Sequence, residues 1–105
     1  MCRNVAFRPQ GTWGSQRVHG PGSLAAFTRS LAKGVAHKGI TVNAIDPGPT
    51  DAGWMTPDFR ARLLEESRFR RLGHPQDAAR LIIFLASNAG EWITGQLIHS
   101  RGDFA

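Results

Sequence analysis

The clearest helical periodicity near the start of the chain lies in residues 21–38. Apolar side chains recur there at three- and four-residue spacing on one face, at Leu24, Phe27, Leu31 and Val35. Pro21 suits a first helical position, where its missing N–H costs nothing. Gly39 suits a left-handed helix end. The pattern therefore predicts an amphipathic helix over this stretch.

The remaining periodic segments follow in quick succession. Residues 40–45 are rich in β-branched side chains and predict a strand, which the Asp-Pro-Gly-Pro sequence of residues 46–49 cannot continue. A second helix is expected after Thr56 as N-cap, with Phe59 and Leu63 as its apolar stripe. Residues 75–87 carry the strongest helical pattern, at Ala78, Leu81, Ile82 and Leu85. A short strand centred on residues 96–99 comes last.

The predicted order is helix, strand, helix, helix, strand, which indicates an α/β fold. A strand–helix–strand unit of this length implies a right-handed parallel crossover. Two parallel strands alone make a poor sheet, because parallel sheets are covered on both faces and have further neighbours. Residues 21–105 are thus expected to be part of a larger α/β layer. Residues 1–20 lack both periodicities and are expected to be an irregular leader.

Composition narrows the class of protein. The chain has 105 residues, 41% of them hydrophobic and 20% charged, which is typical of one globular domain. No apolar run approaches the roughly 20 residues that cross a bilayer, so no membrane partner is expected. Cys2 is the single cysteine, and no signal-peptide pattern precedes it. These features favour a cytoplasmic protein.

The net charge of +5 is unevenly distributed, because no Asp or Glu precedes Asp46. One interpretation is a basic arm that meets nucleic acid or another anionic surface. The other is a solvated helix face next to an irregular leader. We favour the second and expect no nucleic-acid partner, because only Trp13 offers an aromatic platform and no nucleic-acid-binding motif is present.

Two long segments resemble one enzyme family. Residues 24–55 resemble the helix, strand and Pro-Gly turn of short-chain dehydrogenases/reductases, and residues 71–104 are similar to that family's last helix and last strand, in the manner of 3-oxoacyl-carrier-protein reductases. The matching positions are Arg71, Gly73, Pro75, Asp77 and Ala79, then Thr94, Gly95 and Gln96. The resemblance implies the C-terminal part of a Rossmann-like, doubly wound parallel sheet, with the N-terminal half of the fold missing, in a family that binds NAD or NADP.

The resemblance also implies site residues. Pro47, Gly48, Pro49 and Thr50 are expected on the cofactor side, where a turn past the end of a strand exposes backbone groups to the nicotinamide and Gly48 permits close approach. A plain strand-ending turn is the alternative. Trp54 and Met55 match the loop that closes over substrate in the family, although they equally suit packing against the sheet.

The residues that carry the family's chemistry are not matched. Residues 11–14 neither follow a predicted strand nor open a helix, so they fail as a glycine-rich phosphate turn. The tyrosine and lysine positions of the family's Tyr-x-x-x-Lys motif fall on Arg17 and Pro21, and the chain contains no tyrosine. Ala52 stands where a cofactor-contacting threonine is often found. No residue is therefore assigned to catalysis, and none to a metal.

These observations lead to two functional hypotheses. The first is a fragment of a reductase for small carbonyl or alcohol substrates, inactive alone, arising from a truncated or frame-disrupted copy. The second is an interaction module that pairs with itself or with a related reductase subunit, because an exposed sheet edge and an apolar helix stripe seek partners. The arginine cluster Arg68, Arg70 and Arg71 suits either an acidic carrier or phosphorylated substrate, or a solvated helix end.

Overall fold

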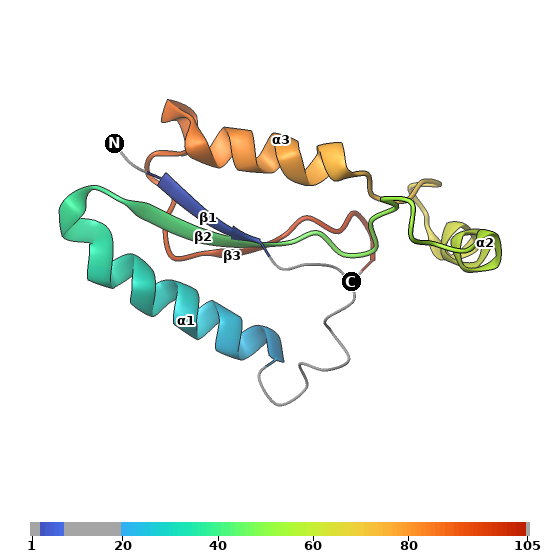
Figure 1. Cartoon of the computed structure of the whole chain (residues 1–105), viewed down its shortest axis with the longest axis horizontal. Helices are drawn as coiled ribbons and strands as arrows, with labels where there is room; N and C mark the ends of the chain where they lie inside the picture. Colours follow the sequence, from blue (N-terminus) through green and yellow to red (C-terminus); the bar gives the residue numbers. More distant parts are fainter. Residues whose placement is uncertain (1–2, 8–19, 105) are drawn as a thin grey trace.

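The chain forms three layers, with helices on both faces of a parallel sheet (Figure 1). The computed structural model describes residues 3–7 and 20–104. The sheet has the order β1-β2-β3, with β1 at Arg3–Phe7, β2 at Thr41–Asp46 and β3 at Leu97–His99. Both neighbouring pairs are parallel. The predicted α/β class and parallel pairing are confirmed.

Strand β1 corrects the expectation that residues 1–20 are irregular. Arg3–Phe7 pairs with the whole of β2, from Arg3 opposite Thr41 to Phe7 opposite Ile45. The segment is too short to show a periodicity, and the unfilled edge of β2 is what selects it as a strand, since strand formation depends strongly on tertiary context. Residues 1, 2 and 8–19 lie outside the described part of the chain.

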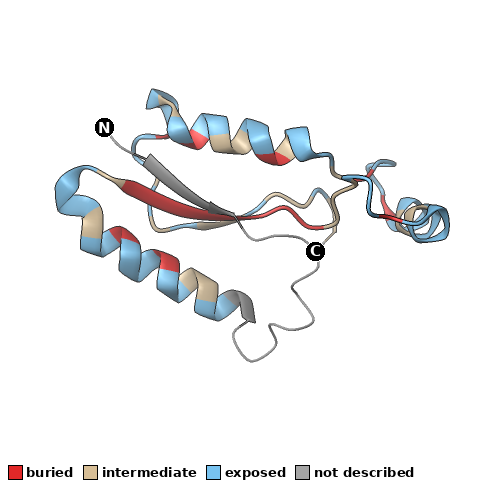
Figure 2. Ribbon diagram, viewed as in Figure 1, coloured by how far each residue is buried: buried red, intermediate tan, exposed pale blue. Residues whose placement is uncertain are grey.

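Strand β2 is the centre of the core. All six of its residues are buried (Figure 2). The segment before β3 is joined to it through backbone bonds from Gly95 N to the Val42 carbonyl at 2.7 Å and from Ala44 N to the Gln96 carbonyl at 2.8 Å. A strand buried on both faces is what a parallel sheet covered by helices requires.

Helix α1, Gly20–Val35, lies on one face of the sheet and continues as the 3-10 turn η2, Ala36–Lys38. The left-handed end predicted at Gly39 is confirmed by its φ of 72°. The predicted apolar stripe is only partly the packing face: Phe27 is 64% exposed and Leu31 42% exposed. Thr28 and Ala32 are buried instead. Thr28 can be buried because its hydroxyl donates to the Leu24 carbonyl at 2.6 Å.

Helix α3, Pro75–Ala86, covers the opposite face of the sheet and leads into η3, Asn88–Gly90. Its predicted stripe is confirmed, because Ala78 and Leu85 are buried and Leu81 and Ile82 half-buried. Helix α2, Pro57–Glu66, lies at one end of the molecule and buries none of its residues. Its predicted N-cap is confirmed, since the Thr56 hydroxyl accepts from Phe59 N at 3.2 Å.

Candidate functional site

The predicted cofactor-side turn leaves the carboxyl end of β2, the central strand. Pro47 and Gly48 are buried, while Pro49 and Thr50 are half-buried. Gly48 has a φ of 64°, in the left-handed region that favours glycine. Its carbonyl accepts from the Thr50 hydroxyl at 3.2 Å. The structure thus brings these four residues together in one turn at the end of the sheet where doubly wound folds bind their ligands.

Asp46, the last residue of β2, stabilises the turn at residues 47–50 through its side-chain carboxylate. Its Oδ1 accepts from Gly48 N at 3.3 Å, and its Oδ2 lies 2.9 Å from both His99 Nδ1 and the Arg101 guanidinium. Burial raises the pKa of the Asp46 carboxyl, but the hydrogen bonds of His99 and Arg101 outweigh it, so that the pKa is lowered overall. A buried carboxylate with these partners joins β2 to the segment that follows β3.

Sequence reasoning missed this role of Asp46. From the sequence alone, Asp46 is only the start of a strand-breaking loop. The signal available in the sequence is an acidic residue directly after an apolar strand, because such a carboxyl is buried only when it is paired. Its partners His99 and Arg101 lie more than fifty residues away and could not be identified from spacing.

A glycine of the Arg-x-Gly-x-Pro pattern anchors the far end of the turn. Gly73 N donates to the Pro49 carbonyl at 3.3 Å, and Asp51 N donates to the Gly73 carbonyl at 2.8 Å. A Cβ at position 73 would lie 2.9 Å from the Pro49 carbonyl oxygen. The close approach of two backbones therefore explains why this position holds glycine.

The two predicted substrate-loop residues differ in their surroundings. Trp54 is 51% exposed, donates from Nε1 to the Thr50 carbonyl at 2.8 Å, and lies 5.7 Å from the Phe59 ring, tilted by 45°. Met55 is buried. Trp54 is therefore placed beside the turn and exposed on the surface, whereas Met55 packs inside.

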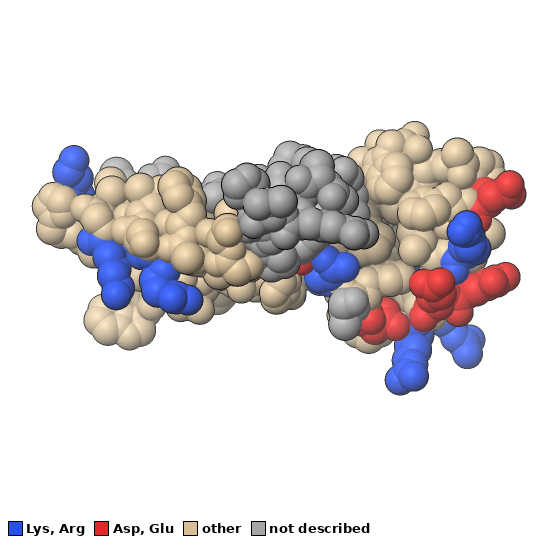
Figure 3. Space-filling view, turned by 90° about the horizontal axis from the view of Figure 1, so that it is seen from below, with Lys and Arg blue, Asp and Glu red and all other residues tan. Residues whose placement is uncertain are grey.

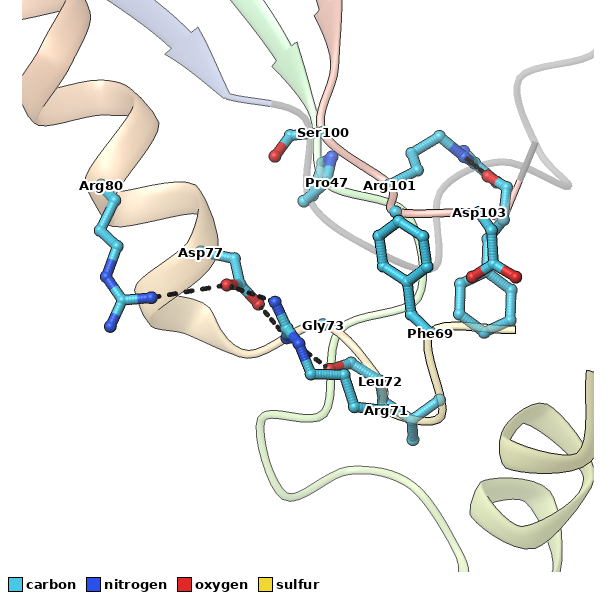
Figure 4. A pocket seen from close by; sticks show the side chains of 12 residues that line it. Pro47, Phe69, Arg71, Leu72, Gly73, Asp77, Arg80, Ser100, Arg101 and Asp103 are labelled. Carbon is cyan, nitrogen blue, oxygen red and sulfur yellow. Dashed lines mark hydrogen bonds and ion pairs between the residues drawn. The ribbon is translucent and has the colours of Figure 1, made fainter. Parts of the chain in front are cut away.

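A cavity of about 260 Å³ lies between the beginning of α3 and the segment after β3 (Figure 4). Its lining includes arginines and acids from both sides: Arg71, Asp77 and Arg80, then Arg101 and Asp103. Arg71 makes a bidentate ion pair with Asp77, in which its two terminal guanidinium nitrogens lie 2.8 and 3.0 Å from the carboxylate oxygens. Asp77 also accepts from His74 N at 2.7 Å at the helix start.

Most other charged side chains of the described residues are exposed, apart from the half-buried ion pair of Arg60 with Asp51 at 2.8 Å. Arg68 and Arg70, the neighbours of Arg71 in the predicted basic cluster, lie on the surface. Figure 3 shows Lys and Arg side chains without acidic neighbours over the α1 part of one face, and both signs of charge at the end formed by α2. Within the described ranges, no three His, Cys, Asp or Glu side chains gather as metal ligands do. No helix there is long and apolar enough to span a membrane.

Arg17, at the family's tyrosine position, and residues 11–14, the rejected phosphate turn, lie outside the described residues. Pro21, at the family's lysine position, is the second residue of α1, one position later than predicted.

Comparison with known proteins defines the class. Residues 21–102 match the family model described as enoyl-(acyl carrier protein) reductase. The chain is 57% identical over 83 residues to the uncharacterized oxidoreductase YjdA of Bacillus subtilis, covering 79% of this chain and 33% of YjdA. It is 39% identical over 82 residues to the 3-oxoacyl-[acyl-carrier-protein] reductase FabG of Escherichia coli, covering 75% of this chain and 34% of FabG.

Comparison with solved structures also finds a reductase with a similar fold. The angucycline C-6 ketoreductase LanV, solved with bound NADP, superposes with a TM-score of 0.72 at 29% identity, over 95% of this chain and 42% of LanV. The described residues form part of a Rossmann-like fold. The chain belongs to the short-chain dehydrogenase/reductase family. It spans about a third of the length of the curated relatives it matches.

Proposed function

We propose that this chain forms the nicotinamide- and substrate-facing part of a short-chain dehydrogenase/reductase and that, as 105 residues alone, it does not reduce carbonyls. The observation that supports the lack of carbonyl reduction is the absence of tyrosine from the sequence. Reduction of a carbonyl in this family needs a phenol that donates a proton to the oxygen and an ammonium that lowers the phenol's pKa. The matching positions hold Arg17 and Pro21.

The residues present fit one end of an NAD or NADP molecule. The turn of residues 47–50 lies at the carboxyl end of the central strand, and Gly48 has a left-handed conformation there, with a φ of 64°. A bound dinucleotide in its reduced form, NADH or NADPH, would supply hydride to a small carbonyl substrate. The chain's own contribution is to place Pro47, Gly48, Pro49 and Thr50 beside the nicotinamide and the exposed Trp54 toward the substrate, while the buried Met55 supports the loop from inside. No glycine-rich turn in the sequence matches the pyrophosphate end of the dinucleotide, which supports weak binding or none.

Dinucleotide titration and turnover test the proposal. Calorimetry of the purified chain with NADPH and with NADH is expected to give no binding or binding only at millimolar concentration. Absorbance of NADPH is expected to stay constant with a panel of ketones, while E. coli FabG with its own substrate serves as the active control. Ketone-dependent oxidation of NADPH by this chain contradicts the proposal directly.

The second candidate function is an interaction module, and the exposed apolar residues favour it. Phe27 and Leu31 lie exposed on α1, and Ile83, Phe84 and Trp92 lie exposed on and after α3, on the other face of the sheet. Large apolar side chains gathered on a surface commonly mark an interface. The partner proposed is a second copy of this chain or a related reductase subunit.

Sedimentation equilibrium at tens of micromolar tests this candidate. The unmodified chain is expected to form dimers or larger species. Leu31→Glu is expected to weaken self-association more than Lys33→Glu, the matched control two residues further along α1. A monomer throughout this concentration range argues against self-pairing.

A further inference from the structure

The segment after β3, residues 100–104, connects two parts of the candidate site that are distant in sequence. It begins beside the end of β2, where Ser100 N donates to the Asp46 carbonyl at 2.8 Å. It then turns back on itself, with Phe104 N donating to the Arg101 carbonyl at 3.1 Å. Arg101 and Asp103 extend from it on one side of the cavity (Figure 4). We call these five residues the closing segment.

Arg101 ties the closing segment to the cofactor-side turn. Its guanidinium donates to Asp46 Oδ2 at 2.9 Å, and Asp46 Oδ1 accepts from Gly48 N. The aliphatic part of Arg101 also lies against Gly48: a Cβ there would be 2.9 Å from Arg101 Cγ. Arg101 therefore stabilises the turn in two ways, through its ion pair with the Asp46 carboxylate and by packing directly against Gly48. Because the Asp46 side chain is buried, water does not readily replace this contact.

Asp103 ties the closing segment to the loop between α2 and α3. Its Oδ2 accepts from Arg68 N at 2.6 Å, and its Oδ1 lies 3.2 Å from the Ser67 hydroxyl. The loop needs such support, because Arg70 has a φ of 59°, which non-glycine residues seldom adopt. Phe69 from this loop packs close to Gly102 of the closing segment.

The turn at residues 47–50 and the loop between α2 and α3 are thus both bonded to the closing segment, and they are also connected to each other. The turn at residues 47–50 is joined to the segment before α3 through Gly73, and that segment follows the loop held by Asp103. Trp54, which precedes α2 in the chain, donates a hydrogen bond from its indole to the Thr50 carbonyl in the turn. Hydrogen bonds therefore connect the closing segment both to the turn at residues 47–50 and to the loop between α2 and α3.

We propose that the closing segment is a latch that sets the position of the turn at residues 47–50, with Arg101 and Asp103 as its positioning residues. The latch is a property of this fold, and only its consequence for nicotinamide binding rests on the proposed function. Neither side chain is assigned a contact with cofactor or substrate. Their effect acts through Asp46 and Gly48 on one side and through the α2–α3 loop on the other.

Two local probes report the position of the turn without any nucleotide. Hydrogen exchange compares the Gly48 amide, which is bonded to Asp46, with the Ala44 amide, which is bonded to Gln96 inside the sheet. The indole N–H signal of Trp54 in a proton–nitrogen NMR spectrum reports its bond to Thr50. The Trp92 signal is the internal reference, since Trp92 is 95% exposed.

Arg101→Met removes the charge and keeps an unbranched side chain over Gly48. It is expected to speed exchange of the Gly48 amide at least tenfold relative to that of Ala44 and to shift the Trp54 signal but not that of Trp92. Arg101→Lys is expected to restore most of both. Arg80→Met is the matched control, because Arg80 lines the same cavity, is 77% exposed, and lies 3.7 Å from its partner Asp77.

Two outcomes overturn the latch: no change at Gly48 and Trp54 in Arg101→Met, or exchange accelerated by the same factor at Gly48 and Ala44. If Arg101→Met does not fold, Asp103→Asn tests the bond between the closing segment and the α2–α3 loop. Asp103→Asn is expected to speed hydrogen exchange of the Arg68 and Gly48 amides. An unchanged exchange rate at Gly48 in this variant overturns the proposal. Dinucleotide binding is measured separately, so failure of the proposed function leaves these results unaffected.

Discussion

Asn43 and Gln96 are paired side chain to backbone, and this pairing attaches the Thr-Gly-Gln motif to the central strand. Asn43 Oδ1 accepts from Gln96 N at 3.1 Å, while Asn43 Nδ2 donates to the Ile93 carbonyl at 3.0 Å. The Thr94 hydroxyl accepts from Val42 N at 3.0 Å. A buried amide in β2 thus satisfies backbone groups on either side of Thr94 and starts β3 in register.

Replacement of Asn43 by alanine tests this attachment. Asn43→Ala is expected to lower the free energy of unfolding by about 2 kcal/mol, because two backbone groups lose their partner and each unsatisfied buried group costs about 1–3 kcal/mol. Urea denaturation followed by circular dichroism measures the loss. Asn88→Ala, at an exposed position, is the control and is expected to stay within about 0.5 kcal/mol of the unmodified chain. Equal losses in the two variants would show that the Asn43 bonds contribute nothing specific.

The helices were the most predictable part of the fold from the sequence. Pro57 and Thr56 mark the start of α2, and the stripe of α3 identifies its buried face, since these signals are local. The stripe of α1 was misleading. Its packing face carries the small Thr28 and Ala32, which permit close approach to the sheet, while the bulkier Phe27 and Leu31 lie further round the helix. Hydrophobicity alone does not report which face a sheet will accept.

The candidate site was predictable only where a single turn forms it. Residues 47–50 follow a strand directly, so their position at its carboxyl end follows from the order of elements. The contacts that fix them come from Arg101 and Gly73, and such long-range partners depend on the sheet order. Strand β1 was missed for the same reason, because only its pairing with β2 identifies it.

Asp77 makes stability depend on pH in the acid range. Hydrogen bonds from the Arg71 guanidinium, and then from His74 N, lower the pKa of the Asp77 carboxyl from 3.8 to about 2. Because the folded-state pKa is the lower one, the stabilisation is fully present above the unfolded value of 3.8 and is lost as the pH falls through about 2.

The comparison of Asp77→Asn with the unmodified chain measures this contribution. The difference in their urea midpoints is expected to be constant from pH 5 to 7 and to shrink as the pH falls from about 4 to about 2. Asp58→Asn, at the exposed start of α2, controls for removal of an acidic group from a first helical turn. A difference for Asp77→Asn that does not change over the acid range contradicts the pairing.

Gly34 and Gly39 separate the effect of backbone angle from the effect of space. A Cβ at either position would meet no atom of the described residues within 4 Å, but Gly34 lies in α1 and Gly39 has a φ of 72°. Gly34→Ala is expected to raise the free energy of unfolding by about 0.5 kcal/mol, since alanine favours the helix. Gly39→Ala is expected to lower it by about 1 kcal/mol, because the left-handed conformation is strained for alanine. Thermal and urea denaturation of both variants measure the two values, and a stabilised Gly39→Ala would contradict the assigned conformation.

Gly48 combines the strained angle with lack of space, and Gly39 therefore serves as its reference. With a φ of 64° it has the same backbone penalty for alanine, of about 1–2 kcal/mol. The added Cβ would also lie 2.9 Å from Arg101 Cγ, so Arg101 must move away from its contact with Asp46. Gly48→Ala is thus expected to lose more stability than Gly39→Ala in urea denaturation. In an Arg101→Gly background the excess should disappear, because Arg101 Cβ and Cγ, which would lie 3.0 and 2.9 Å from the added Cβ, are both gone. An excess that persists there would place its cause in the backbone and not in Arg101.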